Sequence, residues 1–224
     1  MSPGDLPVGE PVDPAPARRP ERRDRDGRSV ALRPVDPKAH VASLFAATRD
    51  HPEVWTYMRY GPFGDESEMR GWIATLVSSE DPLFLTVIDR ASDAPVGIVS
   101  FMNIDVGMRH VELGNIWYAP AAQRTRANTE TVFLMLEEAF QDLGYRRVEW
   151  KCDALNTRSR AAALRLGFTF EGVFRQHMII KGRNRDTAWY SILDQEWPAI
   201  RANMKRWLES EPGSVSLGQL NSAG

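Results

Sequence analysis

The chain has 224 residues, of which 42% are hydrophobic and 26% charged, a composition typical of an ordinary globular domain. Its 28 Lys and Arg against 30 Asp and Glu give a net charge of −2, which provides no overall attraction to nucleic acid or an anionic membrane. The single cysteine, Cys152, excludes an internal disulfide framework and a multi-cysteine zinc site. We therefore expect a cytoplasmic protein with no metal and no membrane-spanning helix.

Both ends of the chain lack the apolar content of a packed core. Six of the 15 prolines lie in the first twenty residues, and alternating charges follow up to Arg28. The arginines of this stretch are balanced by acids, which disfavours a nucleic-acid partner. Residues 211–224 are rich in Ser and Gly. We predict a disordered tail over 1–28, a folded domain over 29–210 and a flexible tail over 211–224.

Within the domain, the spacing of apolar residues predicts alternating strands and helices. In chain order these are strand 30–34, helices 37–48 and 66–78, strands 83–89, 96–103 and 109–118, helix 129–143, strand 147–152, helix 156–166, strands 168–171, 174–181 and 186–193, and helix 197–208. The turn-prone residues 91–95 predict an antiparallel hairpin, and the later helical crossover predicts a mixed α/β sheet.

The most informative segment connects the strand that ends before Pro120 to the long helix after it. Its polar loop contains Arg124 and Arg126. A helix N-terminus has unpaired N–H groups and a partial positive charge, so this loop suits phosphate oxygens. An ordinary capped helix with surface arginines is the alternative, and spacing alone does not decide between them.

Four segments also keep a specific order and spacing, namely 112–117, 123–130, 156–162 and 166–172. Together they resemble the GNAT acyltransferase superfamily, nearest its RimJ/RimL-like branch, over about residues 30–208. The resemblance implies a mostly antiparallel twisted sheet flanked by helices and splayed between its fourth and fifth strands. It also implies transfer of an acyl group from acetyl-CoA, or another acyl-CoA, to a primary amine by direct attack.

The resemblance assigns two sets of residues to the acyl-CoA. The pyrophosphate loop comprises Gln123, Arg124, Thr125, Arg126, Ala127, Asn128 and Thr129. The pantetheine contacts the backbone of Ile116, Trp117 and Tyr118, and the cofactor set also includes Asn156 and Arg158.

One departure from the family concerns Arg126 and Asn128, which stand where the family has small residues in this loop. Arg lacks the conformational freedom of Gly. Its side chain either adds charge for the phosphates or narrows the pocket. A phosphopantetheine arm on an acyl carrier protein therefore stays open as the donor. A module that binds acyl-CoA without turnover also stays open, because the Tyr and the carboxylate of the family's site are absent, with Ala163 and Met178 at those positions.

The reaction needs a proton donor for the departing thiolate. Ser159 matches the position that the RimL-like branch associates with this acid, while the Tyr of other branches would fall at Ala163 and is absent. A hydroxyl that only caps the helix is the alternative.

The reaction also needs a base for the amine. The branch places a carboxylate where this chain has Met178. The candidates are Glu112, His110 two residues before it on the same strand face, and His177, which is next to Met178. Partial burial would raise the pKa of Glu112 toward neutrality, whereas an imidazole has a suitable pKa of about 6.5 without a shift. We favour Glu112. Surface positions for these side chains are the alternative.

Aromatic residues surround the expected acceptor side of the cleft. Trp55, Tyr57 and Tyr60 either cover this side or pack in the core, and Trp150 and Trp189 are predicted to be core or partner surface. The acceptor is a small-molecule or protein amine, and a homodimer stays open.

Overall fold

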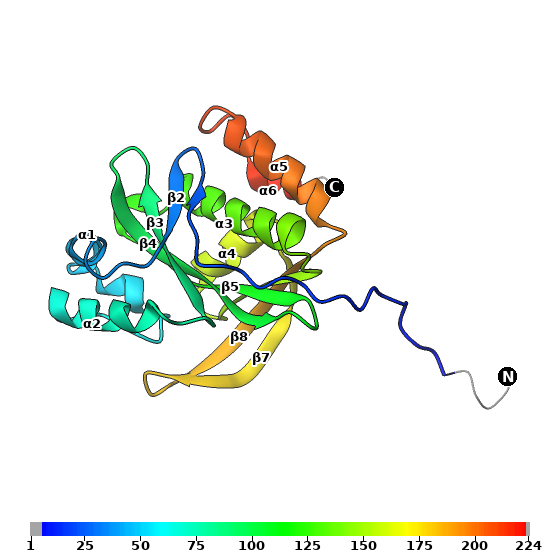
Figure 1. The fold of residues 1–224 in the computed structure, drawn as a ribbon, viewed down its shortest axis with the longest axis horizontal. Coiled ribbons are helices and arrows are strands. Elements are labelled where there is room, and N and C mark those ends of the chain that lie inside the picture. Colours follow the sequence, from blue (N-terminus) through cyan, green and yellow to red (C-terminus); the bar gives the residue numbers. More distant parts are fainter. Residues whose placement is uncertain (1–5, 223–224) are drawn as a thin grey trace.

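One eight-stranded twisted sheet, in the order β1-β2-β3-β4-β5-β6-β8-β7, organises the chain (Figure 1). The computed structural model describes residues 6–222. All neighbouring strands are antiparallel except β5 and β6. The strands are β1 (Arg25–Asp26), β2 (Val30–Pro34), β3 (Leu83–Asp89), β4 (Ala94–Asp105), β5 (His110–Tyr118), β6 (Arg147–Asp153), β7 (Thr169–Ile180) and β8 (Arg183–Leu193).

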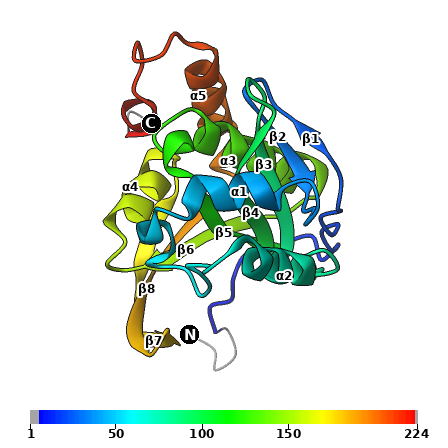
Figure 2. The same ribbon diagram turned by 90° about the vertical axis from the view of Figure 1, so that its left-hand side faces the viewer.

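Helices cover both faces of this sheet, and side-chain alternation along the strands decides what faces each set (Figure 2). In β3, Leu83 and Leu85 join the larger core with α3 and α5, whereas Phe84 joins a second core with α1 and α2. The helices are α1 (Val41–Thr48), α2 (Glu66–Leu76), α3 (Ala127–Glu137), α4 (Thr157–Arg165), α5 (Trp197–Glu209) and α6 (Leu217–Ser222), with short 3-10 turns at Pro52–Trp55 and Pro120–Ala122 and a π-helical turn at Glu138–Asp142.

The parallel pair β5 and β6 separates after a short contact. Only three residue pairs join these strands. The first is His110 with Arg147, and the last is Glu112 with Glu149. Beyond them β5 bulges at Asn115, whose φ is +52°, while β6 continues along β8. Counted without the two-residue β1, these are the fourth and fifth strands. The mixed sheet splayed at this point is confirmed.

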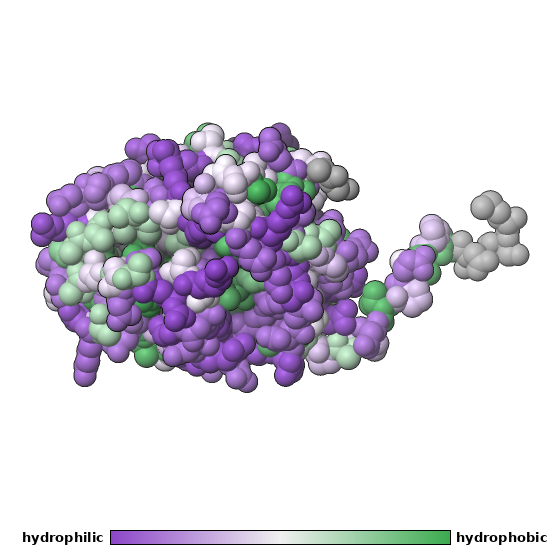
Figure 3. Space-filling view, turned by 90° about the horizontal axis from the view of Figure 1, so that it is seen from above, coloured by the Kyte–Doolittle hydropathy of each residue, from purple (hydrophilic) through white to green (hydrophobic). Residues whose placement is uncertain are grey.

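The predicted disordered tail over 1–28 is wrong for its second half. Residues 6–16 are exposed and extend away from the body (Figure 3), and residues 1–5 lie outside the described part. From Ala17 onward the chain is packed, with the Ala17 N–H donating to the Val106 carbonyl at 2.9 Å. Arg25 is buried, forms β1 and pairs with Glu138. A local count of charges does not reveal a partner so distant along the chain.

The flexible C-terminal tail is also wrong in part, because residues 217–222 form α6. Leu217 is buried, and the Asn221 side chain donates to the Arg165 carbonyl at 3.0 Å. One apolar anchor after a Ser- and Gly-containing linker is enough for a docked helical turn. Residues 223–224 lie outside the described part.

Strand β7 was expected as two strands, 168–171 and 174–181. It is one strand with register shifts near Gly172 and between Phe174 and Met178. The connection to β8 consists of Lys181 and Gly182, whose φ values of +48° and +72° fit a type I′ hairpin turn. No helix within residues 6–222 has the length and apolar character to cross a membrane.

The buried pair of Arg25 and Glu138 predicts a stability effect. Replacing Arg25 with Met should lower the free energy of unfolding by about 2–3 kcal/mol, because Glu138 keeps only the half-exposed Arg23 as a cation. Urea denaturation measures this change. The control is Arg28→Met, which removes an exposed guanidinium. Equal stability of the two variants would contradict the buried-pair interpretation.

Candidate active site

A pocket of about 750 Å³ opens where β5 and β6 separate. Its walls come from the segment before α2, from β5 and β6, from the start of α4, and from β7 and β8. The polar side chains on these walls include Tyr57, Arg59, Asn103, Glu112, Asn115, Lys151, Asn156, Ser159, His177 and Arg185. The three predicted catalytic residues, Glu112, Ser159 and His177, therefore line the same pocket.

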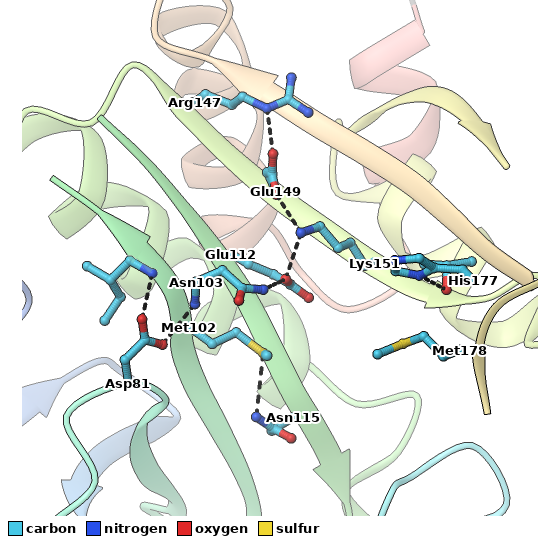
Figure 4. Close-up of polar contacts among 12 residues, drawn as sticks. Asp81, Met102, Asn103, Glu112, Asn115, Arg147, Glu149, Lys151, His177 and Met178 are labelled. Atoms are coloured by element: carbon cyan, nitrogen blue, oxygen red, sulfur yellow. Dashed lines mark hydrogen bonds and ion pairs between the residues drawn. The ribbon is translucent and has the colours of Figure 1, made fainter. Parts of the chain in front are cut away.

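Glu112 is buried at the point where the strands part (Figure 4). Its Oε2 atom lies 3.1 Å from the Lys151 ammonium and accepts a hydrogen bond from the Asn103 amide at 2.5 Å. Burial raises the pKa of Glu112, although Lys151 and Asn103 act in the opposite direction. Within residues 6–222 its Oε1 atom accepts no hydrogen bond, so one carboxylate oxygen is available to a substrate or water.

Lys151 is fixed by three neighbours. Besides Glu112, it lies 2.8 Å from Glu149 and 3.7 Å from the ring centroid of Trp189. Glu149 in turn pairs with Arg147 at 2.8 Å. Trp189 therefore lines the pocket and holds a cation there, outside the two clusters of buried core residues.

Ser159 lies in the first turn of α4. The cap of this helix is Asn156, whose Oδ1 atom accepts from the Ser159 backbone N–H at 3.1 Å. The Trp150 indole donates to the Ser159 Oγ atom at 3.0 Å. Because the hydroxyl oxygen accepts this bond, its own proton remains available for donation. The side chain of Ser159 is thus not the helix cap.

His177 lies at the irregular part of β7, next to Gln176, whose φ is +50°. Its Nδ1 atom is 2.9 Å from the Thr187 hydroxyl on β8. The ring is more exposed than Glu112, and its Nε2 atom contacts no hydrogen-bonding group within residues 6–222. This geometry supplies an imidazole on the wall opposite β5.

The loop before α3 supplies unpaired backbone donors. The N–H groups of residues 124–126, 128 and 129 have no acceptor within the described residues, while that of Ala127 bonds to Thr125. The exposed Arg124 has a φ of +61°. Such a turn at a helix N-terminus fits phosphate oxygens.

Arg126 does not point its charge into this loop. Its guanidinium donates to the carbonyls of Leu208, at 2.7 Å, and Ser210 at the end of α5, and it stacks on Trp207. The guanidinium is therefore held away from the loop, so neither the expected extra charge nor the expected narrowing gains support, and the assignment of Arg126 to the acyl-CoA stays a prediction.

The other residues assigned to the acyl-CoA fall into two groups. Ile116 and Asn156 line the pocket. The side chains of Trp117 and Tyr118 are buried, so their backbone alone is available along the open edge of β5. Arg158 is exposed and does not line the pocket, and its assignment stays a prediction.

A family model described as an acetyltransferase (GNAT) domain matches residues 29–169. The chain belongs to the GNAT family. The superfamily inferred from the sequence is thereby confirmed, and the protein is a transferase. A crystal structure of a GCN5-related N-acetyltransferase from Brucella melitensis is 41% identical, with a TM-score of 0.89 over 93% of this chain and 98% of that chain.

Two further relatives bear on substrates. YdaF of Bacillus subtilis (strain 168), a candidate ribosomal N-acetyltransferase, is 32% identical over 45% of this chain and 55% of its own length, so the match spans about half of that relative. The microcin C7 self-immunity acetyltransferase MccE, solved with acetyl-CoA and AMP, is 25% identical with a TM-score of 0.66 over 75% of this chain and 93% of that chain. The name of YdaF agrees with the RimJ/RimL-like branch.

Sequence reasoning missed several polar residues of this GNAT pocket, above all Lys151 and Asn103. The sequence does contain a signal for Lys151, because it is a charged residue between Trp150 and Cys152 at the apolar end of a predicted strand. Nothing local marks Asn103, because it contacts Glu112 across the β4–β5 ladder.

The loop geometry predicts different roles for its two arginines. Arg124→Glu should weaken binding of coenzyme A about tenfold or more, because it replaces an available cation with a repelling charge. Arg126→Gln should instead lower the melting temperature, because the carbonyls at the end of α5 lose their donor. Calorimetric titration and thermal melting separate the effects. Unchanged affinity in Arg124→Glu would remove this loop from the coenzyme site.

Ser159 provides a kinetic prediction. Ser159→Ala should lower turnover by about 100-fold, the usual loss for a general acid, with coenzyme A affinity nearly intact. Single-turnover kinetics measures the chemical step. The matched control is Ser43→Ala, which removes a hydroxyl on α1 that bonds the Pro95 carbonyl away from the pocket. A chemical step as fast as wild type would exclude Ser159 from proton transfer.

Proposed function

We propose that this GNAT domain is a cytoplasmic N-acetyltransferase that moves the acetyl group of acetyl-CoA to a primary amine. One observation carries the proposal. A carboxylate with an open oxygen, Glu112, and a hydroxyl with an available proton, Ser159, line one pocket at the gap between β5 and β6. These are the two proton-transfer groups that the reaction requires.

The coenzyme fits the residues on the other side of the gap. The unpaired N–H groups of the loop before α3 suit its pyrophosphate, and β5 has no ladder partner toward β6 beyond Glu112, which suits the amides of pantetheine. The Arg126 side chain is bound to the end of α5 and does not fill the loop. The altered loop sequence therefore gives no reason to replace coenzyme A with another acyl carrier. Free acetyl-CoA, the ligand of the MccE structure, is therefore the favoured donor over a carrier-protein arm.

In the proposed reaction the amine attacks the thioester carbonyl in its neutral form, the new C–N bond forms, and the C–S bond breaks. Glu112 accepts the amine proton, directly or through water, at its open Oε1 atom. Ser159 donates its hydroxyl proton to the departing thiolate while the Trp150 indole holds the oxygen in place. Water then carries the proton that Glu112 took from the amine back to the Ser159 oxygen, so both groups return to their starting state. Backbone N–H groups on the open edge of β5 stabilise the oxyanion.

The test is release of free thiol when the purified chain is mixed with acetyl-CoA and a panel of primary amines, with mass spectrometry of the product. A gain of one acetyl group on the amine is the expected result. Tight binding of acetyl-CoA with no thiol release from any amine, including host extract, would favour a non-catalytic binding module.

The base predicts a distinct pH dependence, because Glu112 must be ionised to accept a proton. With an acceptor whose amine is already neutral, the rate should rise with pH through the raised pKa of Glu112. Lys151→Met should move this limb to higher pH, because the cation that favours the carboxylate is removed. Glu112→Gln should be slow at every pH.

His177→Gln is the competing variant. If the imidazole is the base, this variant loses the acidic limb while Glu112→Gln stays active, an outcome opposite to our expectation. If both variants keep the full rate, the pocket acts by positioning alone.

A further inference from the structure

Two arginines on the pocket wall have no acidic partner. Arg185 on β8 is half-buried, and Arg59 lies in the segment before α2. Within residues 6–222, neither guanidinium has a carboxylate oxygen within 4 Å. The carboxylates on the pocket wall are engaged elsewhere. Glu112 is held by Lys151 and Asn103, and Asp153 accepts from the Leu155 N–H at 2.9 Å.

Both arginines lie beside Met178. Arg59 lies 3.3 Å from the sulfur of Met178, and Met178 is the cross-strand partner of Arg185. The Nε atom of Arg185 donates to the Thr187 hydroxyl at 3.2 Å, and the same hydroxyl lies 2.9 Å from His177. Figure 4 draws His177 and Met178 on the same side of the pocket, facing Glu112 and Lys151. Strands β7 and β8 thus present a basic wall.

This arrangement is unfavourable for the empty protein. Burial lowers the pKa of Arg185. The charge of Asp153 opposes this lowering, and the charge of Arg59 adds to it. The half-buried guanidinium of Arg185, with the exposed guanidinium of Arg59 nearby, is stabilised by an anion that pairs with both. Guanidinium groups match the planar or tetrahedral oxygens of carboxylate and phosphate.

We propose that Arg185 and Arg59 bind an anionic oxyacid group, a carboxylate or a phosphate, that the amine acceptor carries. The inference rests on the proposed function, because it places the acceptor in this pocket. The phosphate-binding loop before α3 is not part of the pocket wall, so the anion at Arg185 is separate from the pyrophosphate of the coenzyme. Glu112 and Arg185 line the same pocket, so we place the amine and the anion on one molecule or chain end.

The kinetic test uses acceptors that differ in one charge. Glycine is paired with glycinamide, and O-phosphoethanolamine with 2-methoxyethylamine, with rates corrected to the neutral amine. We expect kcat/KM to be at least about tenfold higher for one anionic member than for its neutral partner. Arg185→Gln should lower kcat/KM for that anionic member about 10- to 100-fold and leave the neutral member within about threefold. Arg59→Gln should act in the same direction.

Two further variants keep this test interpretable. Arg185→Lys keeps the charge without the planar fork and should fall between wild type and Arg185→Gln. Arg183→Gln removes an exposed arginine on the same strand that does not line the pocket, and should match wild type. Equal rates for charged and neutral members in wild type, or an equal loss for both in Arg185→Gln, would overturn the proposal.

A binding test separates this proposal from the proposed function. Orthophosphate and acetate are titrated calorimetrically into the full chain, into Arg185→Gln and into Arg124→Gln. Binding of at least one anion that is lost in Arg185→Gln and kept in Arg124→Gln supports the site, even if no amine releases thiol. Thiol release from neutral amines, with no anion binding or with binding lost only in Arg124→Gln, supports the transferase and overturns the anion site.

Discussion

The structure depends on one cation at the fork of the sheet. The last rung between β5 and β6 places Glu112 beside Glu149, and two like charges at paired positions would repel. Lys151 lies 3.1 Å from the first and 2.8 Å from the second, so it holds the rung at which the strands part. The same ammonium favours ionisation of a buried carboxylate that burial would otherwise keep protonated. The same lysine therefore bridges the last rung before the gap and favours the ionised form of the candidate base.

The sheet was predictable where local pattern and long-range pairing agree. Strand β3 has the predicted bounds because its apolar run ends at charged, turn-prone residues, and its hairpin partner is the next strand along the chain. Prediction failed where the deciding partner is distant. Arg25 pairs with Glu138, and strands β2 to β5 lie between them in the sequence. Strand β7 continues through bulges, where the interrupted hydrophobic pattern predicts two separate strands.

The site shows the same division. The capping pattern from Asn156 to Ser159 and the strand position of Glu112 could be found in the sequence, and all three residues line the pocket. The direction of Arg126 could not be found, because its acceptors are carbonyls at the end of α5. Arg59 carries no local signal either, and Arg185 belongs to a basic hairpin run, 181–186, whose sequence fits a solvated turn as well as an anion site. An arginine in a loop or hairpin is usually a solvated surface residue, and only the absence of a partner in three dimensions distinguishes these two.

The partner of each charge decides what that charge does. On the face of the sheet covered by α3, charged side chains form ion pairs, such as Arg25 with Glu138 and Arg201 with Glu137. These pairs connect strands and helices to one another. Around the gap between β5 and β6 the charges are not all paired. Arg124 on the loop and Arg185 on the pocket wall have no acidic partner within residues 6–222. Two separate regions of unbalanced positive charge flank one carboxylate with an open oxygen. A donor with phosphates on one side and an anionic acceptor on the other would together balance the site, with the amine between them directed at Glu112.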